Sequence, residues 1–210
     1  MDANLHTIIE KRINRTIGNL QNNKMDAYYV KTCAEAVKLC EELCPEGQTV
    51  SCGGSATLDQ SGIKALLRSG KYQFLDREAK GADPAQIMHQ AFSCDTYFTS
   101  TNAVTENGEL YNVDGVGNRT AAMLYGPKSV IVVAGYNKIV TDLDAARDRV
   151  RSIAAPANAV RLDRKVPCKV LGNCRDCRSD ERLCCGFVVL AQQQFKGRIK
   201  VILVGEELGF

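Results

Sequence analysis

The sequence lacks tryptophan, holds only two histidines and carries little net charge. Its 27 basic and 24 acidic residues give a formal charge of +3, which excludes the strongly basic footprint of a nucleic-acid-binding domain. No apolar run approaches the roughly 18 residues that a transmembrane helix needs, so we expect no contact with a membrane. The N-terminal residues show no basic flank followed by an apolar core, so we expect no secretion signal and a cytoplasmic protein.

Cysteine is abundant instead, with ten residues among 210. In a reducing cytoplasm, clustered cysteines indicate metal or redox chemistry more often than disulfides. An apolar fraction of 45% over this length suits one hydrophobic core that needs no disulfide to fold. We therefore predict a single domain over residues 1–210, with residues 165–186 as a cysteine-rich loop.

Short β-branched runs alternate with amphipathic helices along most of the chain. Apolar residues at helical spacing predict an N-terminal helix over residues 3–21. Residues 129–134 are nearly all apolar, which is typical of a strand buried on both faces. The predicted strands are residues 27–30, 49–52, 72–75, 96–101, 110–113, 129–134, 187–190 and 199–204. Helices between these strands favour an α/β fold with a mostly parallel sheet, whose ligands bind beyond the carboxyl ends of the strands.

Three local patterns make more detailed predictions. Thr32 opens a second helix, with Glu35 three residues later as a capping box. The turn sequence Asn107-Gly108 predicts a hairpin between the strand over residues 96–101 and the strand over residues 110–113. A further helix begins at Thr141 and carries Leu143, Ala146, Val150 and Ile153 on its apolar side. The five cysteines before residue 100 are expected to be core thiols, namely Cys33, Cys40, Cys44, Cys52 and Cys94, with a place in a pocket wall as the alternative for Cys52 and Cys94.

The other five cysteines fall within residues 168–185, in a segment with little apolar periodicity. Their spacing is Cys168-x5-Cys174-x2-Cys177-x6-Cys184-Cys185. The Cys-x-x-Cys step brings two thiolates onto one metal or cluster, and no histidine lies near. We predict that Cys168, Cys174, Cys177 and Cys184 hold an iron–sulfur cluster of the 4Fe–4S type, with a structural zinc as the alternative. The fourth ligand stays open between Cys168, Cys185 and an outside group.

A glycine loop lies between a predicted strand and a predicted helix, at Gly53, Gly54 and Ser55. Glycines there allow close approach of a ligand to the backbone, and the hydroxyls of Ser55 and Thr57 add hydrogen-bond donors for an anion. We predict that these four residues bind a substrate anion. The alternative is a tight strand–helix turn with Ser55 as the N-cap.

Residues 99–119 form a second polar segment, dense in Asn, Asp, Glu, Thr and Gly. Segments of this kind commonly line a site, although each residue is also an ordinary turn former. The predicted substrate-binding residues are Asn102, Asn118 and Arg119, and the predicted catalytic residues are Glu106 and Asp114.

Lys138 follows the buried strand at its carboxyl end. That position predicts a lysine that faces a ligand, with a solvated lysine as the alternative. Asp76 and Arg77 also follow a predicted strand, on weaker grounds.

Three stretches carry a resemblance to a known family. SCGGSATL at residues 51–58, the long run over residues 99–162 and GNCRDCRSDERLC at residues 172–184 are similar to the LUD-domain family, which includes the lactate-utilisation protein C group. The resemblance covers nearly the whole chain and implies the layered α/β fold of the NagB/RpiA/CoA-transferase superfamily. The best-known members belong to a cytoplasmic iron–sulfur system that oxidises lactate to pyruvate, and the cysteine tail of some relatives looks like an iron–sulfur site.

These observations lead to the hypothesis of an iron–sulfur protein that binds a small organic anion, such as a 2-hydroxy or 2-oxo acid, and takes part in its oxidation. Arg119 and Lys138 would pair with the carboxylate, and Asp114 or Glu106 would handle a proton. The sequence has one cysteine cluster and no flavin or nicotinamide fingerprint, so a redox partner protein is expected. Other expected partners are a small organic acid, or a phosphorylated or CoA-type ligand, and a second copy of the chain.

The alternative hypothesis is a non-redox acyl or CoA transferase, or a metabolite-binding protein with a structural zinc. Thr105-Glu106-Asn107-Gly108 is similar to the Ser-Glu-Asn-Gly motif of CoA-transferases. In those enzymes the glutamate is the nucleophile that forms an acyl intermediate.

Overall fold

A parallel sheet forms the centre of the protein. The computed structural model describes residues 2–210, and within this range six strands pair in the order β1–β10–β7–β4–β2–β3, all parallel. Their bounds are β1 Asp26–Val30, β2 Thr49–Cys52, β3 Gln73–Leu75, β4 Thr96–Thr99, β7 Ser129–Gly135 and β10 Ile199–Val204. The prediction of an α/β fold with a mostly parallel sheet is confirmed.

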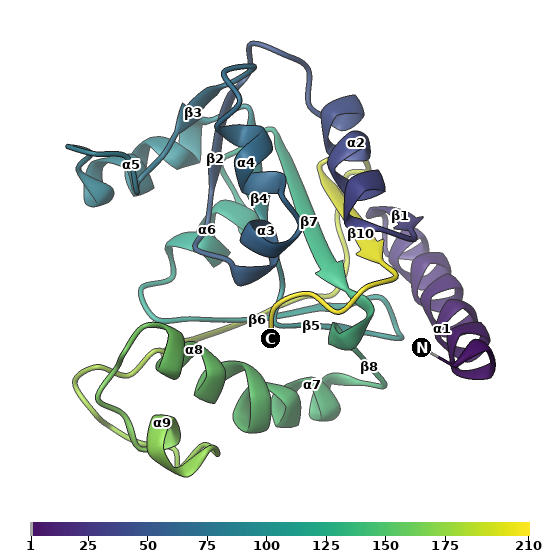
Figure 1. Cartoon of the computed structure of the whole chain (residues 1–210), viewed down its shortest axis with the longest axis vertical. Coiled ribbons are helices and arrows are strands. Elements are labelled where there is room, and N and C mark those ends of the chain that lie inside the picture. The colour runs from purple at the N-terminus through teal and green to yellow at the C-terminus, as the bar shows by residue number, and fades with distance from the viewer. Residues whose placement is uncertain (1) are drawn as a thin grey trace.

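Helices cover both faces of this sheet (Figure 1), and alternate residues of β7 show why. Val130 and Val132 pack with α1 (Ala3–Asn22) and α6 (Asn118–Leu124) on one face. Ile131 and Val133 pack on the other face with α2 (Cys33–Leu43), α3 (Ala56–Gln60) and α4 (Ile63–Leu67). All four of these β7 side chains are fully buried, which confirms the prediction of a strand buried on both faces.

A second sheet lies at the carboxyl end of β7. It has the order β8–β5–β6–β9, and its strands are β5 Ala103–Thr105, β6 Leu110–Asp114, β8 Ile139–Val140 and β9 Gly186–Leu190. Figure 1 shows β5 and β6 running across the end of β7, with α7 (Leu143–Arg149) beyond them. Ala103 and Tyr111 of this sheet pack against Ala146 of α7.

The predicted hairpin needs a correction, because residues 96–101 are not its first strand. The chain leaves the central sheet after Thr99, and residues 103–105 pair antiparallel with β6 around the Asn107-Gly108 turn. Residues 100–102 break the strand because they turn toward a cavity described below. One β-branched and aromatic stretch therefore serves two sheets, which period-two patterning cannot reveal.

The helix predicted from Thr141 begins at Leu143, after the N-cap Asp142, and contains one wider turn. After α7, residues Val150–Ala154 form a π-helical turn, and α8 (Ala155–Arg161) continues it. Pro156 has no N–H to donate to the carbonyl of Ser152, which interrupts the α-helical pattern at this point. The wider turn rotates Ile153 outward, and this side chain is 50% exposed rather than on the apolar face.

Other local predictions can be compared directly. The capping box between Thr32 and Glu35 is present. Cys40, Cys44 and Cys94 are buried core thiols, whereas Cys33 and Cys52 are half-buried. The cysteine-rich segment is not wholly irregular, because α9 spans Pro167–Leu171. The remaining short elements are α5 Pro84–Gln90, η1 Ala91–Ser93 and η2 Tyr136–Lys138. Over residues 2–210, no helix is long and apolar enough to span a membrane.

Candidate functional site

A cavity of about 430 Å³ lies beyond the carboxyl ends of β2, β3, β4 and β7. This is the edge of a parallel sheet where α/β proteins bind their ligands. The structure brings most of the predicted site residues to its wall: Gly54, Ser55, Thr57, Asn102, Asp114, Asn118, Arg119, Lys138 and Cys184. Residues from four separate segments of the sequence therefore share one site.

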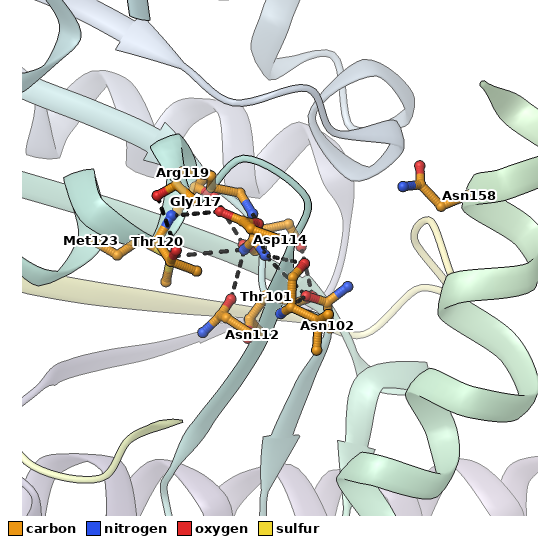
Figure 2. A network of polar contacts seen from close by, with 12 residues as sticks. Thr101, Asn102, Asn112, Asp114, Gly117, Arg119, Thr120, Met123 and Asn158 are labelled. Atoms are coloured by element: carbon orange, nitrogen blue, oxygen red, sulfur yellow. Dashed lines mark hydrogen bonds and ion pairs between the residues drawn. The ribbon is translucent and has the colours of Figure 1, made fainter. Parts of the chain in front are cut away.

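The π-helical turn and α8 form the opposite side of the cavity. Val150, Ala154 and Ala155 contribute apolar surface there, and Asn158 contributes an amide. Figure 2 shows Asn158 standing apart from the polar network on the sheet side, with space between them. Single π turns are frequent at functional sites, because the wider turn re-aims side chains.

Positive charge dominates the cavity wall. The basic lining residues are Arg77, Arg119, Lys138, Arg161 and Arg164, and the acidic ones are Glu78 and Asp114. Both acids are already in ion pairs, since Glu78 contacts Lys64 at 2.6 Å and Asp114 contacts Arg119 at 2.7 Å. The wall therefore holds several cations that no carboxylate of residues 2–210 neutralises.

Arg119 is the centre of the polar network drawn in Figure 2. Its Nε donates to Oδ1 of Asp114 at 2.8 Å, and Nη2 donates to Oδ1 of Asn102 at 3.0 Å. Nη1 donates to Oδ1 of Asn112 at 2.6 Å and to the carbonyl of Ser100 at 2.9 Å. Nη2 also reaches the carbonyl of Val113 at 3.2 Å. A guanidinium has five N–H donors, so this network leaves none for a ligand.

Both carboxylate oxygens of Asp114 also accept hydrogen bonds within the protein. Its Oδ1 accepts from Arg119, and its Oδ2 accepts from the backbone N–H of Thr120 at 2.8 Å. The side chain is 7% exposed at the cavity wall. The predicted proton-handling role of Asp114 stays a prediction, and its observed contacts tie β6 to the first turn of α6.

Lys138 lies at the floor of the cavity and is 3% exposed. Its Nζ donates to Oγ1 of Thr57 at 2.8 Å, to Oγ of Ser100 at 3.0 Å and to the carbonyl of Thr101 at 3.3 Å. Three acceptors match the three N–H donors of an ammonium group. Within residues 2–210, no carboxylate contacts this nitrogen.

Burial, together with the nearby charges of Arg149 and Arg119, lowers the pKa of Lys138 to about 7. Arg149 is also buried, and its guanidinium donates to the backbone carbonyls of Asn102 and Asn137. Burial lowers the pKa of Arg149 to about 10. Burying two cations without acidic partners costs free energy, and a bound anion would offset that cost.

The glycine loop is the strand–helix turn that the sequence offered as the alternative, and it also lines the cavity. Ser55 is the N-cap of α3 and accepts from the backbone N–H of Leu58 at 3.3 Å, while also lining the cavity. Gly53 lies behind the wall, where an added Cβ would be 3.2 Å from Cδ of Arg119. At Gly54 an added Cβ would lie 2.2 Å from Nη2 of Arg77. Both glycines therefore make room for arginine side chains.

Glu106 lies away from the cavity. Its carboxylate accepts from Nε of Arg12 at 2.6 Å and from Nη2 of Arg15 at 3.0 Å, both on α1. These contacts hold the pKa of Glu106 below its ordinary value against the opposing effect of burial, which is the largest single influence. The structure therefore does not bring this predicted catalytic residue together with the others.

The four predicted cysteine ligands are neighbours on the surface of residues 165–186. Burial raises the pKa of Cys168, and the charges of Cys174, Cys177 and Cys184 raise it further. Hydrogen bonds from Ser179 lower the pKa of Cys177. As placed in residues 2–210, no group of three or more Cys, His, Asp or Glu side chains has the geometry to hold a metal ion.

A second cavity, of about 380 Å³, opens beside these cysteines. Cys174 and Cys184 line it together with Arg147, Arg151 and Arg182. Val150, Ala155 and Cys184 line both cavities. The cysteine-rich segment and the sheet-edge site therefore share a wall.

Four residues of the site were not predicted from the sequence as ligand-binding residues. Ser100 and Thr101 end a strand, Arg149 resembles a surface arginine of an amphipathic helix, and Arg77 had only its position after a strand to mark it. The usable signal was the same for all but Arg149, because each follows a strand of the parallel sheet at its carboxyl end. The burial of Arg149 depends on the tertiary fold.

Fold and site together define a layered α/β protein with a cationic cavity at the carboxyl edge of a parallel sheet. The model of the LUD domain matches residues 13–204, so the chain belongs to the LUD-domain family, which is associated with lactate utilisation. Among solved structures, the chain is similar to the crystal structure of a DUF162 family protein from Deinococcus radiodurans, with a TM-score of 0.51 and 14% identity. That likeness covers 95% of this chain and 98% of the other, and it concerns the fold. None of the curated proteins matches the chain.

Proposed function

We propose that this protein is an iron–sulfur protein of the lactate-utilisation type, which binds a small 2-hydroxy or 2-oxo acid and takes part in its oxidation. The observation that carries the proposal is Lys138, a buried ammonium at the floor of the cavity with three hydrogen bonds and no carboxylate partner. Family membership supports the choice of acid.

The anion is assigned to the floor of the cavity because the charges there are uncompensated. A carboxylate beside Lys138 would offset the cost of burying this cation and that of Arg149 behind it. Thr57 and Ser100 hold the ammonium in position through their hydroxyl oxygens. Arg119 is assigned a positioning role, since its donors are used within the protein and its charge is paired with Asp114. The donors of Lys138 are used as well, but no ion pair within residues 2–210 offsets its charge, so the anion is assigned to Lys138 on charge.

The cysteines are assigned to the cluster on the chemistry of the donor set. Four free thiols lie on one partly exposed segment, where neighbouring cysteines help to raise the pKa of Cys168 and Cys184. Sulfur donors in groups of four suit an iron–sulfur cluster. Cys168, Cys174, Cys177 and Cys184 are the assigned ligands. Such a cluster supplies one-electron transfer when it is bound, and a separate redox protein is needed to accept the electrons. All ten cysteines are free, which supports a reducing, cytoplasmic setting.

No specific contact favours the transferase alternative. A nucleophilic glutamate must reach the substrate, and the carboxylate of Glu106 is paired with Arg12 and Arg15 outside the cavity. We therefore leave Glu106 out of the proposed site.

The first experiment is anaerobic purification followed by a visible absorption spectrum and assays of iron, sulfide and zinc. About four irons and four sulfides per chain support the cluster, as expected for this cofactor type. Cys174→Ser should remove most of the iron, whereas Cys33→Ser, a half-buried thiol on α2, should not. One zinc and no iron would overturn the cluster and make the segment structural.

The second experiment is isothermal titration of the purified protein with L-lactate and with pyruvate. Lys138→Met should weaken binding of both acids at least tenfold while the protein remains folded by circular dichroism. Lys80→Ala, an exposed lysine that does not line the cavity, is the matched control. Failure of both acids to bind the wild-type protein would overturn the assignment of the anion.

A further inference from the structure

Among the arginines that line the cavity in residues 2–210, Arg77 is the one that is half-buried and has no hydrogen-bond or ion-pair partner. It follows β3 and lines the cavity, and its guanidinium forms no hydrogen bond or ion pair with any residue in that range. The neighbouring acid, Asp76, is already paired with Arg68 at 2.7 Å. By contrast, Arg161 donates to Asn158, and both Arg161 and Arg164 are exposed at the rim.

Gly54 makes room for that guanidinium. An added Cβ at position 54 would lie 2.2 Å from Nη2 of Arg77, well inside van der Waals contact. The φ angle of Gly54 lies outside the left-handed region, so its backbone does not itself require glycine. The obstructing atom is the far end of a flexible side chain. A methyl group at position 54 would therefore displace the guanidinium at little cost to the fold.

The cavity wall has more than one positive charge without a counter-charge, so a ligand with two negative charges would match it better than a ligand with one. After Asp114 and Glu78 are assigned to their partners, Lys138 and Arg77 remain as two separate cations that line the cavity and form no ion pair within residues 2–210. A volume of about 430 Å³ falls in the usual range of small-molecule sites, ~300–1,000 Å³. A three-carbon monocarboxylate would leave one of these cations, and much of the volume, unmatched.

We propose that the cavity prefers a dianionic 2-hydroxy or 2-oxo acid, with one carboxylate at Lys138 and a second carboxylate at Arg77, and that Gly54 acts as the spacer that lets Arg77 reach it. This proposal rests on the proposed function, because it deepens the same anion site. A guanidinium binds a carboxylate through two parallel N–H donors, which makes Arg77 a specificity-determining residue rather than a general source of charge.

The matched ligands are L-lactate and L-malate, which differ by one carboxylate in place of a methyl hydrogen. Isothermal titration should give at least tenfold tighter binding of L-malate. The 4-monoamide of malate has nearly the same shape without the second charge, and it should bind no better than L-lactate. Equal affinities for L-malate and its monoamide would overturn the proposal.

Two variants locate the second carboxylate. Arg77→Ala should lower the affinity for L-malate at least tenfold and the affinity for L-lactate much less. Gly54→Ala should give the same pattern because it displaces the guanidinium. The double variant should bind L-malate no more weakly than Arg77→Ala alone, since Gly54 acts through Arg77. Additive losses of L-malate affinity in the double variant would show that Gly54 does not act through Arg77, and would overturn the role of Gly54 as a spacer.

The control is Lys80→Ala, which removes an exposed cation from the same segment outside the cavity and should leave both affinities unchanged. Thermal unfolding of each variant checks that it is folded. If neither acid binds the wild-type protein, the proposed function fails. If both bind equally and Arg77→Ala weakens them equally, the anion site stands and the dianion preference is wrong.

Discussion

Two arginine–aspartate pairs have similar contact distances but lie in different surroundings. Arg119 and Asp114 in the cavity wall approach to 2.7 Å, with side chains 14% and 7% exposed. Arg151 and Asp176, beside the cysteines, approach to 2.6 Å, with side chains 30% and 63% exposed. Contact distance therefore does not separate them. Burial does, because removing one partner of a buried pair leaves a charge that water cannot reach, whereas an exposed charge is solvated at once.

The comparison extends to the segments that carry the pairs. Arg119 joins five loop and strand residues through its five donors, so the cavity wall is held in place before any ligand arrives. Of residues 165–186, only Val166 is buried. A segment with so few buried contacts has little local stability of its own, and metal–thiolate bonds would supply what packing does not.

The largest effect should come from the buried pair. Arg119→Ala leaves Asp114 buried without its partner, so we expect a loss of about 3–5 kcal/mol in the free energy of unfolding. Urea denaturation measures this loss. The control, Arg175→Ala on the exposed cysteine-rich segment, should change stability by less than about 0.5 kcal/mol. A loss in Arg119→Ala no greater than the control would remove the distinction between the two pairs.

The buried lysine gives a prediction of intermediate size. The pKa of Lys138 is about 7 in the folded protein against 10.5 for an ordinary lysine. Above pH 7 the unfolded chain therefore binds a proton that the folded protein has lost, and stability should rise with pH up to about pH 10. The slope from this group is at most about 1.4 kcal/mol per pH unit.

Lys138→Met removes that titration. The difference in unfolding free energy between wild type and variant, measured in urea from about pH 6 to pH 9, should shift in favour of the wild type as the pH rises. A flat difference would mean that the ammonium is stabilised in the folded state as well as in water. That outcome would weaken the case for a ligand anion at this position.

The smallest effect belongs to the exposed pair. Arg151→Ala should cost about 0–1 kcal/mol in global stability, because both charges remain hydrated. Its effect should appear locally, since the side chain of Arg151 holds the carboxylate of Asp176, which accepts from Sγ of Cys174. Faster amide exchange confined to residues 165–186 would agree with this. A loss comparable to that of Arg119→Ala would contradict it.

Much of the fold could be predicted from local sequence patterns, because the spacing of apolar residues indicates which side chains are buried. The apolar run at residues 129–134 is typical of a doubly buried strand, and Thr32 with Glu35 forms the expected capping box. The cavity was predictable in outline, since residues that follow parallel strands gather at one edge. Gly54, Thr57 and Lys138 meet there for that reason.

What the sequence could not show depends on contacts between distant segments. Nothing around Arg149 distinguishes it from the exposed arginines of the same helix, and its burial arises only when α7 packs beside residue 102. The strand pairing of residues 103–105 depends on where the chain turns toward the cavity. Glu106 lies in a polar loop like its neighbours, and only the position of α1 shows that Arg12 and Arg15 neutralise it.

The wall shared by the two cavities has one further consequence. Cys184 faces both of them, so its sulfur is a natural reporter group. Its rate of alkylation by a small maleimide should fall when an organic acid fills the sheet-edge cavity, and should fall to zero when a metal binds the thiolate. A single mass-spectrometric measurement at one atom thus follows ligand occupancy and metal loading in the same sample.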